Sequence, residues 1–421
     1  MRHEDKDISA MDEKQYILNE KNYVKRLDKR LLAFAMFGNM VKTLDNSNLG
    51  SAFISGMEEE LNITGTQYNW MGVLFMVGYL SMQVPSNILL SKYRPSQYLP
   101  LLELIWCILT VSMACVQSVQ QVYVIRFILG LFESGFYPIV FLLGTWYTKH
   151  ELGKRMALLN LCGAMGIGIS GLVQAMMLKT MDGVYGVSGW RWMFLFDAFI
   201  TLLLAIFGYT FLPDYPTTTT WLSKSEREIA IQRNVRSDAH QHSPKSNPSG
   251  KLAKLSLLLG NKYIYPFTVG WAALHISLGA YHVLGIVAKK SGFDPVTANL
   301  LTTPDTLITM FFGLCNGFIS DQLQSRIWCI LIPASFGLIG LMLLLANVQP
   351  FGFLYFSFIV THAGLGSVTS IVMTWASETI TASTELRAMA IATMNTFSSL
   401  MWTWTPLILW PVTDAPEYRK E

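Results

Sequence analysis

Long apolar blocks, separated by short polar stretches, fill most of this 421-residue chain. A helix needs about 20 consecutive apolar residues to cross a bilayer. Blocks of this kind predict eleven spans, at about residues 31–55, 69–91, 98–118, 121–147, 156–178, 190–212, 263–288, 296–320, 326–347, 351–376 and 388–412. The pattern therefore predicts an all-α polytopic membrane protein.

The longest polar stretch divides these spans into two groups. We expect a cytoplasmic N-terminal tail at 1–30, a six-helix bundle at 31–212, a cytoplasmic central loop at 213–262, a bundle of five spans at 263–412 and a short tail at 413–421. The loop includes SDAHQHSPKSNPSG, whose Ser, Pro and Asn content is typical of flexible linkers. Two helical groups joined by one long loop are typical of transporters built from internal repeats.

Composition and charge agree with a membrane protein. Hydrophobic residues make up 52% of the chain and charged residues only 14%, whereas soluble domains carry about 25% charged residues. With the N-terminus inside, most Lys and Arg residues fall on the inner side of the predicted spans, which sets the orientation. They form no stripe or patch, so we expect no nucleic-acid partner.

Cofactor and metal motifs are weak or missing. The GIGISG run at 166–171 matches the dinucleotide pattern, but it lies inside an apolar block, where small residues allow close helix packing. The sequence has no G-x-x-x-x-G-K-[ST] and no H-E-x-x-H, and its five cysteines lack metal-ligand spacing. We therefore expect no cofactor, no metal and no ATP-driven pump. Without a nucleophile–base pair, the chain is not predicted to be an enzyme.

Four ionisable residues stand inside the first and fourth predicted spans, where a charge costs at least about 2.5 kcal/mol. Arg126 and Glu133 lie on one face of the fourth span, about 10 Å apart along the helix and thus too far apart to pair directly. The first span contributes Lys42 and Asp45. A buried network that only locks two helices together is one interpretation. We favour a functional role, because four such residues gather in two spans.

Four stretches carry a family resemblance: RFILGLFESGFYP, GWRWMFLFDA, LDNSNLG and WASETI…ELRAMAIATMN. A G-x-x-x-D-x-x-x-x-R turn at Gly317, Asp321 and Arg326 adds to them. The chain resembles the major facilitator superfamily, and within it the fungal allantoate-permease branch of the anion:cation symporters, which includes pantothenate, biotin, nicotinate and cysteine permeases. The resemblance spans about residues 35–416.

The resemblance implies a two-half helical bundle that works by alternating access, with Gly317, Asp321 and Arg326 at a turn that takes part in the conformational change. It also implies a monomer in the lipid bilayer of the fungal plasma membrane, with an internal membrane as the alternative. Relatives often carry a basic residue where this chain has Asn46.

The relatives have twelve spans, and this sequence ends where a twelfth would follow. The alternative function is therefore a transport-defective truncated relative that acts as a nutrient sensor or is a non-functional remnant.

In the resembled fold, spans one and four line a central cavity. A guanidinium group can hold a carboxylate with two parallel hydrogen bonds, and a buried carboxyl group can take up and release protons. We therefore predict that Arg126, Lys42 and Asn46 bind substrate and that Glu133 carries the proton, with Asp45 as second choice. The predicted substrate is a small organic anion, taken up with protons. Whether it is a vitamin carboxylate, an allantoate-like anion or a sulfur-containing anion stays open.

Residues of the second half complete the candidate site. Trp375 and Asn395 are further substrate-binding candidates in spans ten and eleven. His275 and His282, seven residues apart in span seven, could relay protons or could simply form hydrogen bonds in the helix core. Asn62, in the NIT run of the first outside loop, is a predicted N-glycosylation acceptor.

Overall fold

The computed structural model describes residues 18–136, 139–216, 218–219, 222–223, 226–230, 233, 256, 258–323, 325–346, 349–380 and 384–415. Within these ranges every regular element is helical and there is no strand, so the predicted all-α fold is confirmed. Residues 1–17, most of the predicted central loop and residues 416–421 lie outside the description. We name the two ends of the molecule inner and outer, following the orientation that the charge bias predicts.

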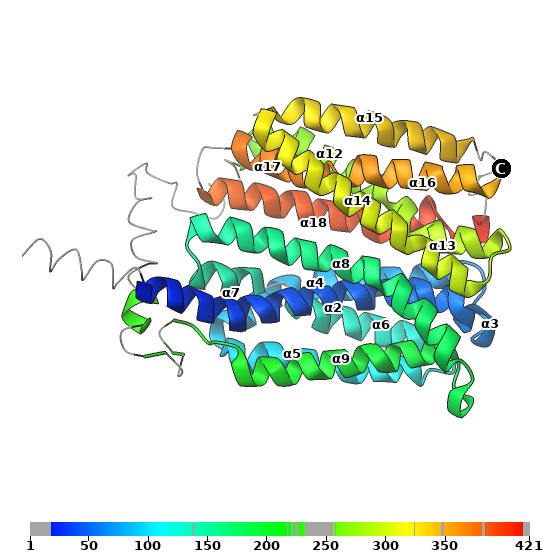
Figure 1. The fold of residues 1–421 in the computed structure, drawn as a ribbon, viewed down its shortest axis with the longest axis horizontal. Helices are drawn as coiled ribbons and strands as arrows, with labels where there is room; N and C mark the ends of the chain where they lie inside the picture. Colours follow the sequence, from blue (N-terminus) through cyan, green and yellow to red (C-terminus); the bar gives the residue numbers. More distant parts are fainter. Residues whose placement is uncertain are drawn as a thin grey trace, which may run out of the picture.

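Helices occupy all eleven predicted ranges, and they gather in two groups. In Figure 1 the first group, blue to green, lies in the lower part of the view, and the second, green to red, lies in the upper part. The first group comprises α2 (Ala33–Ala52), α3 (Glu58–Glu60), α4 (Gln67–Lys92), α5 (Pro95–Ala114), α6 (Val119–Glu133), α7 (Ile139–Trp146), α8 (Lys149–Met181) and α9 (Gly189–Phe211). The second comprises α12 (Ile264–Ser277), α13 (Tyr281–Lys290), α14 (Pro295–Leu323), α15 (Arg326–Leu345), α16 (Phe351–Gly366), α17 (Thr369–Thr379) and α18 (Thr384–Ile408).

Three predicted spans are interrupted. The range 121–147 is divided into α6 and α7, with a turn of 3₁₀ helix at Ser134–Phe136 directly after α6. A similar turn at Leu278–Ala280 separates α12 from α13, and α16 ends at Gly366, three residues before α17 begins. Helix breaks at membrane depth are tolerated where they are buried in protein or line a cavity. These three breaks therefore point to the interior of the bundle.

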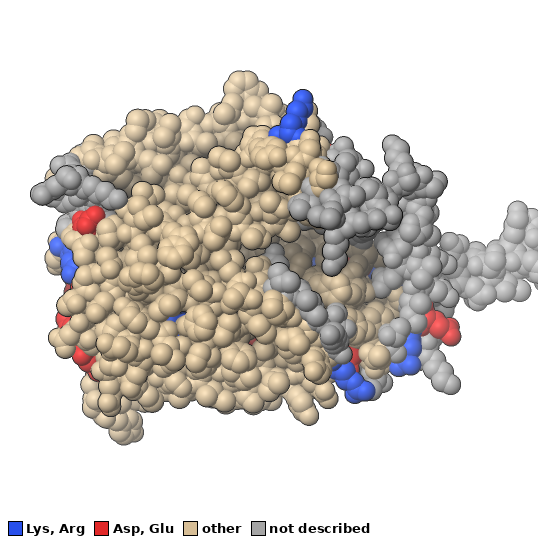
Figure 2. Space-filling model, turned by 180° about the vertical axis from the view of Figure 1, so that it is seen from behind, with Lys and Arg blue, Asp and Glu red and all other residues tan. Residues whose placement is uncertain are grey.

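The surface of the molecule fits a lipid environment. Five stretches are long and apolar enough to cross a membrane by length and composition: Pro95–Ala114, Glu151–Met181, Gly189–Phe211, Arg326–Leu345 and Phe351–Thr379. On the face shown in Figure 2, Lys, Arg, Asp and Glu gather toward the two ends of the long axis and leave a broad band between them almost free of charge. The chain is thus a multi-pass membrane protein.

Small residues bring neighbouring helices close together. Helix α4 packs along α6, α2 along α8, α5 along α9, α12 along α18 and α15 along α16, whereas α8 with α14 and α4 with α18 join the two groups. A Cβ atom at Gly166 would overlap with the backbone of Met40, and one at Gly171 with the backbone of Asn299. The packing interpretation of the GIGISG run thus agrees with the structure, because both glycines lie at helix–helix contacts.

Gly130 provides a direct test of this close packing. A Cβ atom there would overlap with the carbonyl oxygen of Phe75 on α4. We expect Gly130→Ala to push α4 and α6 apart and to destabilise the protein by about 1–3 kcal/mol, the usual cost of overpacking. The melting temperature of the purified protein measures this change. Gly144→Ala is the control, because a Cβ atom there meets nothing within 4 Å. Equal melting temperatures for the two variants would contradict the prediction.

The GWRW part of the recognised GWRWMFLFDA motif stabilises the outer end of the first group. Arg191 on α9 donates two hydrogen bonds to Glu60 and also binds the carbonyl oxygens of Ala114 and Val116. Trp190 adds a bond from Nε1 to Glu60 Oε2 at 2.6 Å. Partial burial raises the pKa of the Glu60 carboxyl, but hydrogen bonds from Ser188, Arg191 and Trp190 outweigh this effect and leave its pKa below the ordinary value.

Candidate functional site

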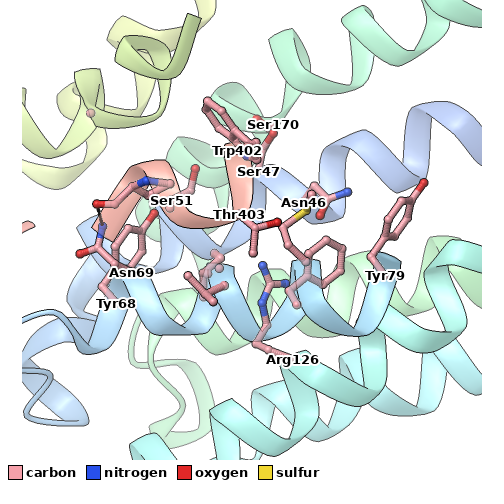
Figure 3. Close-up of a pocket in the computed structure, with 18 of the residues that line it drawn as sticks. Asn46, Ser47, Ser51, Tyr68, Asn69, Tyr79, Arg126, Ser170, Trp402 and Thr403 are labelled. Atoms are coloured by element: carbon pink, nitrogen blue, oxygen red, sulfur yellow. Dashed lines mark hydrogen bonds between the residues drawn. The ribbon is translucent and has the colours of Figure 1, made fainter. Parts of the chain in front are cut away.

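A cavity of about 420 Å³ lies between the two helical groups. Pockets for small molecules usually fall between about 300 and 1,000 Å³. The first group supplies most of its wall, from α2, α4, α6 and α8, and the second group adds residues of α13, α14 and α18. The polar and aromatic lining residues, most of them drawn in Figure 3, are Lys42, Asn46, Ser47, Ser51, Tyr68, Asn69, Phe75, Tyr79, Arg126, Ser170, Thr302, Trp402 and Thr403.

Arg126 places a buried positive charge at this cavity. Its side chain is 4% exposed and rises from α6 toward the space below Asn46 and Thr403 (Figure 3). The guanidinium carbon lies 4.8 Å from the ring centre of Phe75, a cation–π distance. Among the described residues Arg126 has no ion pair, and its Nε has no hydrogen-bond partner. An unpaired buried guanidinium is costly, and an anionic ligand would satisfy it.

Glu133 is not part of the cavity lining but contacts a residue that is. It is the last residue of α6 and is 1% exposed. Asn46 Nδ2 donates a hydrogen bond to its Oε1 at 2.6 Å, and within the described residues its Oε2 has no partner. Since Asn46 itself lines the cavity, the amide connects the substrate space to the carboxyl group. As predicted from their spacing, Arg126 and Glu133 form no direct ion pair.

Lys42 supplies a second cation to the cavity wall. Its Nζ donates to the Tyr79 hydroxyl at 2.9 Å and lies 4.7 Å from the centre of that ring. Lys42 and Arg126 are the charged members of the cavity lining among the described residues, and neither Asp nor Glu is part of it. The lining is therefore suited to an anion.

Asp45 faces away from the cavity. It is 2% exposed, and its Oδ2 accepts a hydrogen bond from Trp106 Nε1 on α5 at 2.7 Å. Successive residues of a helix point about 100° apart, so when Asn46 faces the cavity, Asp45 turns toward α5 and α9. Of the two acidic residues predicted as proton carriers, Glu133 is the one that forms a hydrogen bond with a lining residue, Asn46.

The predicted residues of the second half form their own contacts, between α12 and α18 or between α12 and α17. Asn395 Oδ1 accepts a hydrogen bond from Trp271 Nε1 at 3.1 Å. His275 Nδ1 lies 2.8 Å from Ser398 Oγ. Trp375 stacks edge-on against Phe267, with ring centres 5.3 Å apart. Trp375, Asn395 and His275 are not part of the described cavity lining, and the side chain of His282 lies outside the described part of the structure.

The predicted turn between spans eight and nine carries an ion-pair cluster. Arg326 Nη1 lies 2.8 Å from Asp321 Oδ1, and Nη2 lies 2.9 Å from Glu378 Oε1 on α17. The turn is thereby tied to the inner end of α17. A Cβ atom at Gly317 would meet nothing within 4 Å. At the outer end, Asn62 is exposed in the turn before α4, with a positive φ of 50°, so the predicted glycosylation acceptor lies on the surface.

Sequence reasoning missed much of the cavity wall. Tyr68 and Asn69 at the start of α4 line it, as do Ser51 and Thr403 (Figure 3). Trp402 also lines it, although a tryptophan near the end of a span is typical of a membrane-interface anchor. Polar residues one helix turn apart, such as Ser47 and Ser51 on α2, are the one signal that could have found this face.

Contacts between the two groups lie at the outer end of the molecule. Lys289 Nζ on α13 lies 2.6 Å from Glu59 Oε1 and 3.3 Å from Glu58 Oε2, and Lys290 Nζ lies 3.1 Å from Glu58 Oε1. We name these four residues the outer latch. Asn69 adds bonds to the carbonyl oxygens of Pro406 and Trp410 and accepts one from the amide of Val412.

We expect the outer latch to limit access to the cavity from outside. Lys289→Gln with Lys290→Gln removes its ion pairs, which are worth about 1 kcal/mol in total, so the outward-open population should rise about fivefold. The measurement is labelling of Ser51→Cys by a membrane-impermeant maleimide, in a Cys115→Ser background because Cys115 is exposed.

Lys262→Gln removes a lysine that is exposed and remote in sequence from the latch, and it should leave labelling unchanged. Equal labelling of the latch variant and this control would contradict the prediction.

Two helical groups around one polar cavity, set in a membrane-spanning bundle, define a polytopic membrane transporter. A family model described as Major Facilitator Superfamily matches residues 35–406. The chain belongs to this family.

The relatives agree with the branch that the sequence motifs indicate. The chain is 29% identical to the MFS transporter PfmaC of Pestalotiopsis fici, covering 95% of this chain and 76% of that protein. It is 25% identical to the pantothenate transporter liz1 of Schizosaccharomyces pombe, over 95% of this chain and 78% of the relative. A vitamin H transporter of Saccharomyces cerevisiae is 26% identical over 90% of this chain and 65% of its own length. The resemblance to the branch with pantothenate and biotin permeases is thus confirmed.

Solved structures show the same fold. A D-xylose–proton symporter aligns with a TM-score of 0.71 at 16% identity, covering 94% of this chain and 91% of its own. The predicted two-half helical fold is confirmed.

Proposed function

We propose that this transporter moves a small organic carboxylate into the cell together with a proton. The observation that carries the proposal is the buried Arg126, which faces the cavity without an ion pair among the described residues. Its planar guanidinium group can donate two parallel hydrogen bonds to a carboxylate. Lys42 strengthens the positive potential of the same wall.

Glu133 is the proposed proton carrier. Its carboxyl group is buried, and Asn46 links it to the cavity. Protonation of Glu133 would compensate the charge that a bound carboxylate brings into the membrane interior. Substrate and proton would then enter together, since either one alone leaves an unbalanced charge in a medium of low dielectric constant.

The rest of the lining favours an anion with polar groups along an apolar body. Hydroxyl groups of Ser51, Tyr68 and Thr403 offer hydrogen bonds, and Trp402 offers an aromatic surface. Pantothenate and biotin have this chemistry, and transporters of both are relatives of this chain. We propose a vitamin carboxylate of this class as the substrate, with the plasma membrane as the site of uptake.

Uptake of labelled pantothenate and labelled biotin tests the proposal. The chain is expressed in yeast cells that lack their own transporters for these vitamins, and a fluorescent fusion reports whether it reaches the plasma membrane. We expect uptake that an acidic medium stimulates and a protonophore abolishes. A competition panel with allantoate, nicotinate and cysteine then ranks the anions. A protein that reaches the plasma membrane and takes up none of these anions would overturn the proposal.

A further inference from the structure

One glycine of the cavity wall faces open space. Three glycines line the cavity: Gly50, Gly72 and Gly285. A Cβ atom at Gly50 would lie 3.2 Å from the Tyr68 hydroxyl, and one at Gly285 would overlap with the side chain of Ile54. At Gly72, on α4, an added Cβ atom would meet nothing within 4 Å in the described part of the chain. The volume that a side chain would fill there is therefore left open.

The open space at Gly72 belongs to the cavity and not to the lipid side of α4. Trp70 and Val77 mark the lipid side, since their side chains are 40% and 39% exposed. Successive residues of a helix point about 100° apart, so Gly72 points about 160° away from Trp70 and about 140° away from Val77. Asn69 and Met76, before and after it on the same helix, line the cavity. A side chain at position 72 would thus point into the cavity.

Neither backbone geometry nor helix packing accounts for this glycine. Gly72 lies inside α4, where the backbone suits any residue, and glycine weakens a helix interior because it loses the most conformational freedom on folding. Gly78 makes the close contact of α4 with α6 instead, because a Cβ atom there would overlap with the carbonyl oxygen of Phe127. What distinguishes Gly72 is the room that it leaves in the cavity.

A hydrogen bond between α4 and α18 fixes the level of this room. Asn69 Nδ2 donates to the carbonyl oxygen of Pro406 at 2.9 Å. Helix α4 begins at the outer end and α18 ends there, so the two helices run in opposite directions. Gly72 and Thr403 each lie three residues inward of the bond, which is about 4.5 Å along either helix. The two residues therefore line the cavity at the same level.

Arg126 lies next to this level. Its guanidinium group packs on the ring of Phe75, three residues inward of Gly72 on the same helix. In Figure 3 it rises toward the space below Thr403. A carboxylate held by Arg126 would therefore have the rest of the molecule beside Gly72.

We propose that Gly72 determines which carboxylates the cavity accepts. The missing side chain makes room beside Arg126 for a substrate whose body carries a branch or a ring, and a larger residue would admit only narrow, unbranched carboxylates. The walls of this room are aromatic and apolar, from Tyr68, Phe75 and Met76, which suits a hydrocarbon branch or ring. The inference deepens the proposed function and rests on it, because it takes Arg126 as the site of the carboxylate.

Thermal stability tests whether the room is open. Gly72→Ala should leave the melting temperature of the purified protein within about 1 °C of the wild type or raise it, since alanine favours a helix and its Cβ atom meets nothing. Gly78→Ala is the matched control on the same helix. It should lower the melting temperature by about 2 °C or more, because its Cβ atom overlaps with Phe127. Equal losses at the two positions would overturn the open room.

Transport kinetics test the width. The KM for labelled pantothenate should rise about tenfold or more in Gly72→Leu and about threefold or less in Gly72→Ala. Pantothenate carries two methyl groups on one carbon, and an analogue with hydrogens in their place is the narrow probe. Its inhibition constant against labelled pantothenate should change less than about threefold in Gly72→Leu. Gly144→Leu is the control, at an exposed glycine outside the described cavity lining, and should leave both constants unchanged.

The outcomes separate this inference from the proposed function. An unchanged KM in Gly72→Leu, or equal losses for pantothenate and the narrow analogue, would overturn the role of Gly72 and leave the proposed function standing. Should the wild type reach the plasma membrane and take up no pantothenate and no biotin, the proposed function is overturned, and the role of Gly72 with it.

Discussion

Glu133→Gln is expected to separate substrate movement from the proton gradient. Glutamine keeps the size of the side chain and the oxygen that accepts the hydrogen bond from Asn46, but it has no proton to exchange. The variant should exchange labelled for unlabelled substrate across the membrane at a rate within about threefold of the wild type. Accumulation should disappear. A pH difference of one unit is worth about 1.4 kcal/mol, which drives up to about tenfold accumulation with one proton in the wild type and none in the variant.

The measurement uses proteoliposomes with an imposed pH gradient and a parallel counterflow assay without one. Glu228→Gln removes a carboxylate that is exposed at the inner side, and it should behave like the wild type in both assays. Accumulation by the Glu133 variant at the wild-type level would show that another group carries the proton.

Arg126→Lys is expected to weaken substrate binding by about tenfold or more. Lysine keeps the positive charge but cannot form two parallel hydrogen bonds with a carboxylate, and it loses the contact between the guanidinium plane and Phe75. A tenfold change corresponds to about 1.4 kcal/mol. The rise should appear in KM, with the amount of folded protein unchanged. Arg126→Ala should abolish uptake, because it leaves only Lys42 to attract the anion.

Steady-state uptake over a range of substrate concentrations gives KM, and the protein amount is taken from the same membranes. Arg26→Lys is the control, since Arg26 pairs with Glu226 at the surface, where the side chain is 53% exposed. An unchanged KM in Arg126→Lys would assign Arg126 a structural role.

Much of the fold follows from the apolar blocks. The predicted ranges 69–91, 190–212 and 326–347 agree closely with α4 (Gln67–Lys92), α9 (Gly189–Phe211) and α15 (Arg326–Leu345). The predicted and observed lengths agree because a membrane helix stays apolar across the bilayer and polar residues follow where it leaves the bilayer. The breaks after α6, α12 and α16 are not visible in hydropathy, because a broken helix inside a bundle stays apolar.

The candidate site was predictable only in part. Arg126, Glu133 and Lys42 were identified because they are ionisable residues inside predicted membrane spans, where charges are rare. The direction of each side chain was not predictable. Asp45 and Asn46 are neighbours in sequence, and a rotation of the helix by about 100° would exchange their surroundings. Packing against α5 and α9 decides that Asn46 faces the cavity. The role of Trp402 also depends on tertiary packing, since a tryptophan near a span end looks the same whether it faces lipid or a cavity.

The two helical groups contribute chemically different residues to the cavity wall. All of its charged groups come from the first helical group, whereas the described contribution of the second consists of Gly285, Thr302, Trp402, Thr403 and Pro406, none of which ionises. Under the proposed function, the first group would supply the proton carrier and the cations that hold the carboxylate, and the second group would contact only other parts of the substrate. Substitutions on α14 and α18 could then change which carboxylate fits the cavity without altering the proposed proton carrier Glu133. Permeases for chemically different acids could arise in this way from one ancestral transporter with one coupling mechanism.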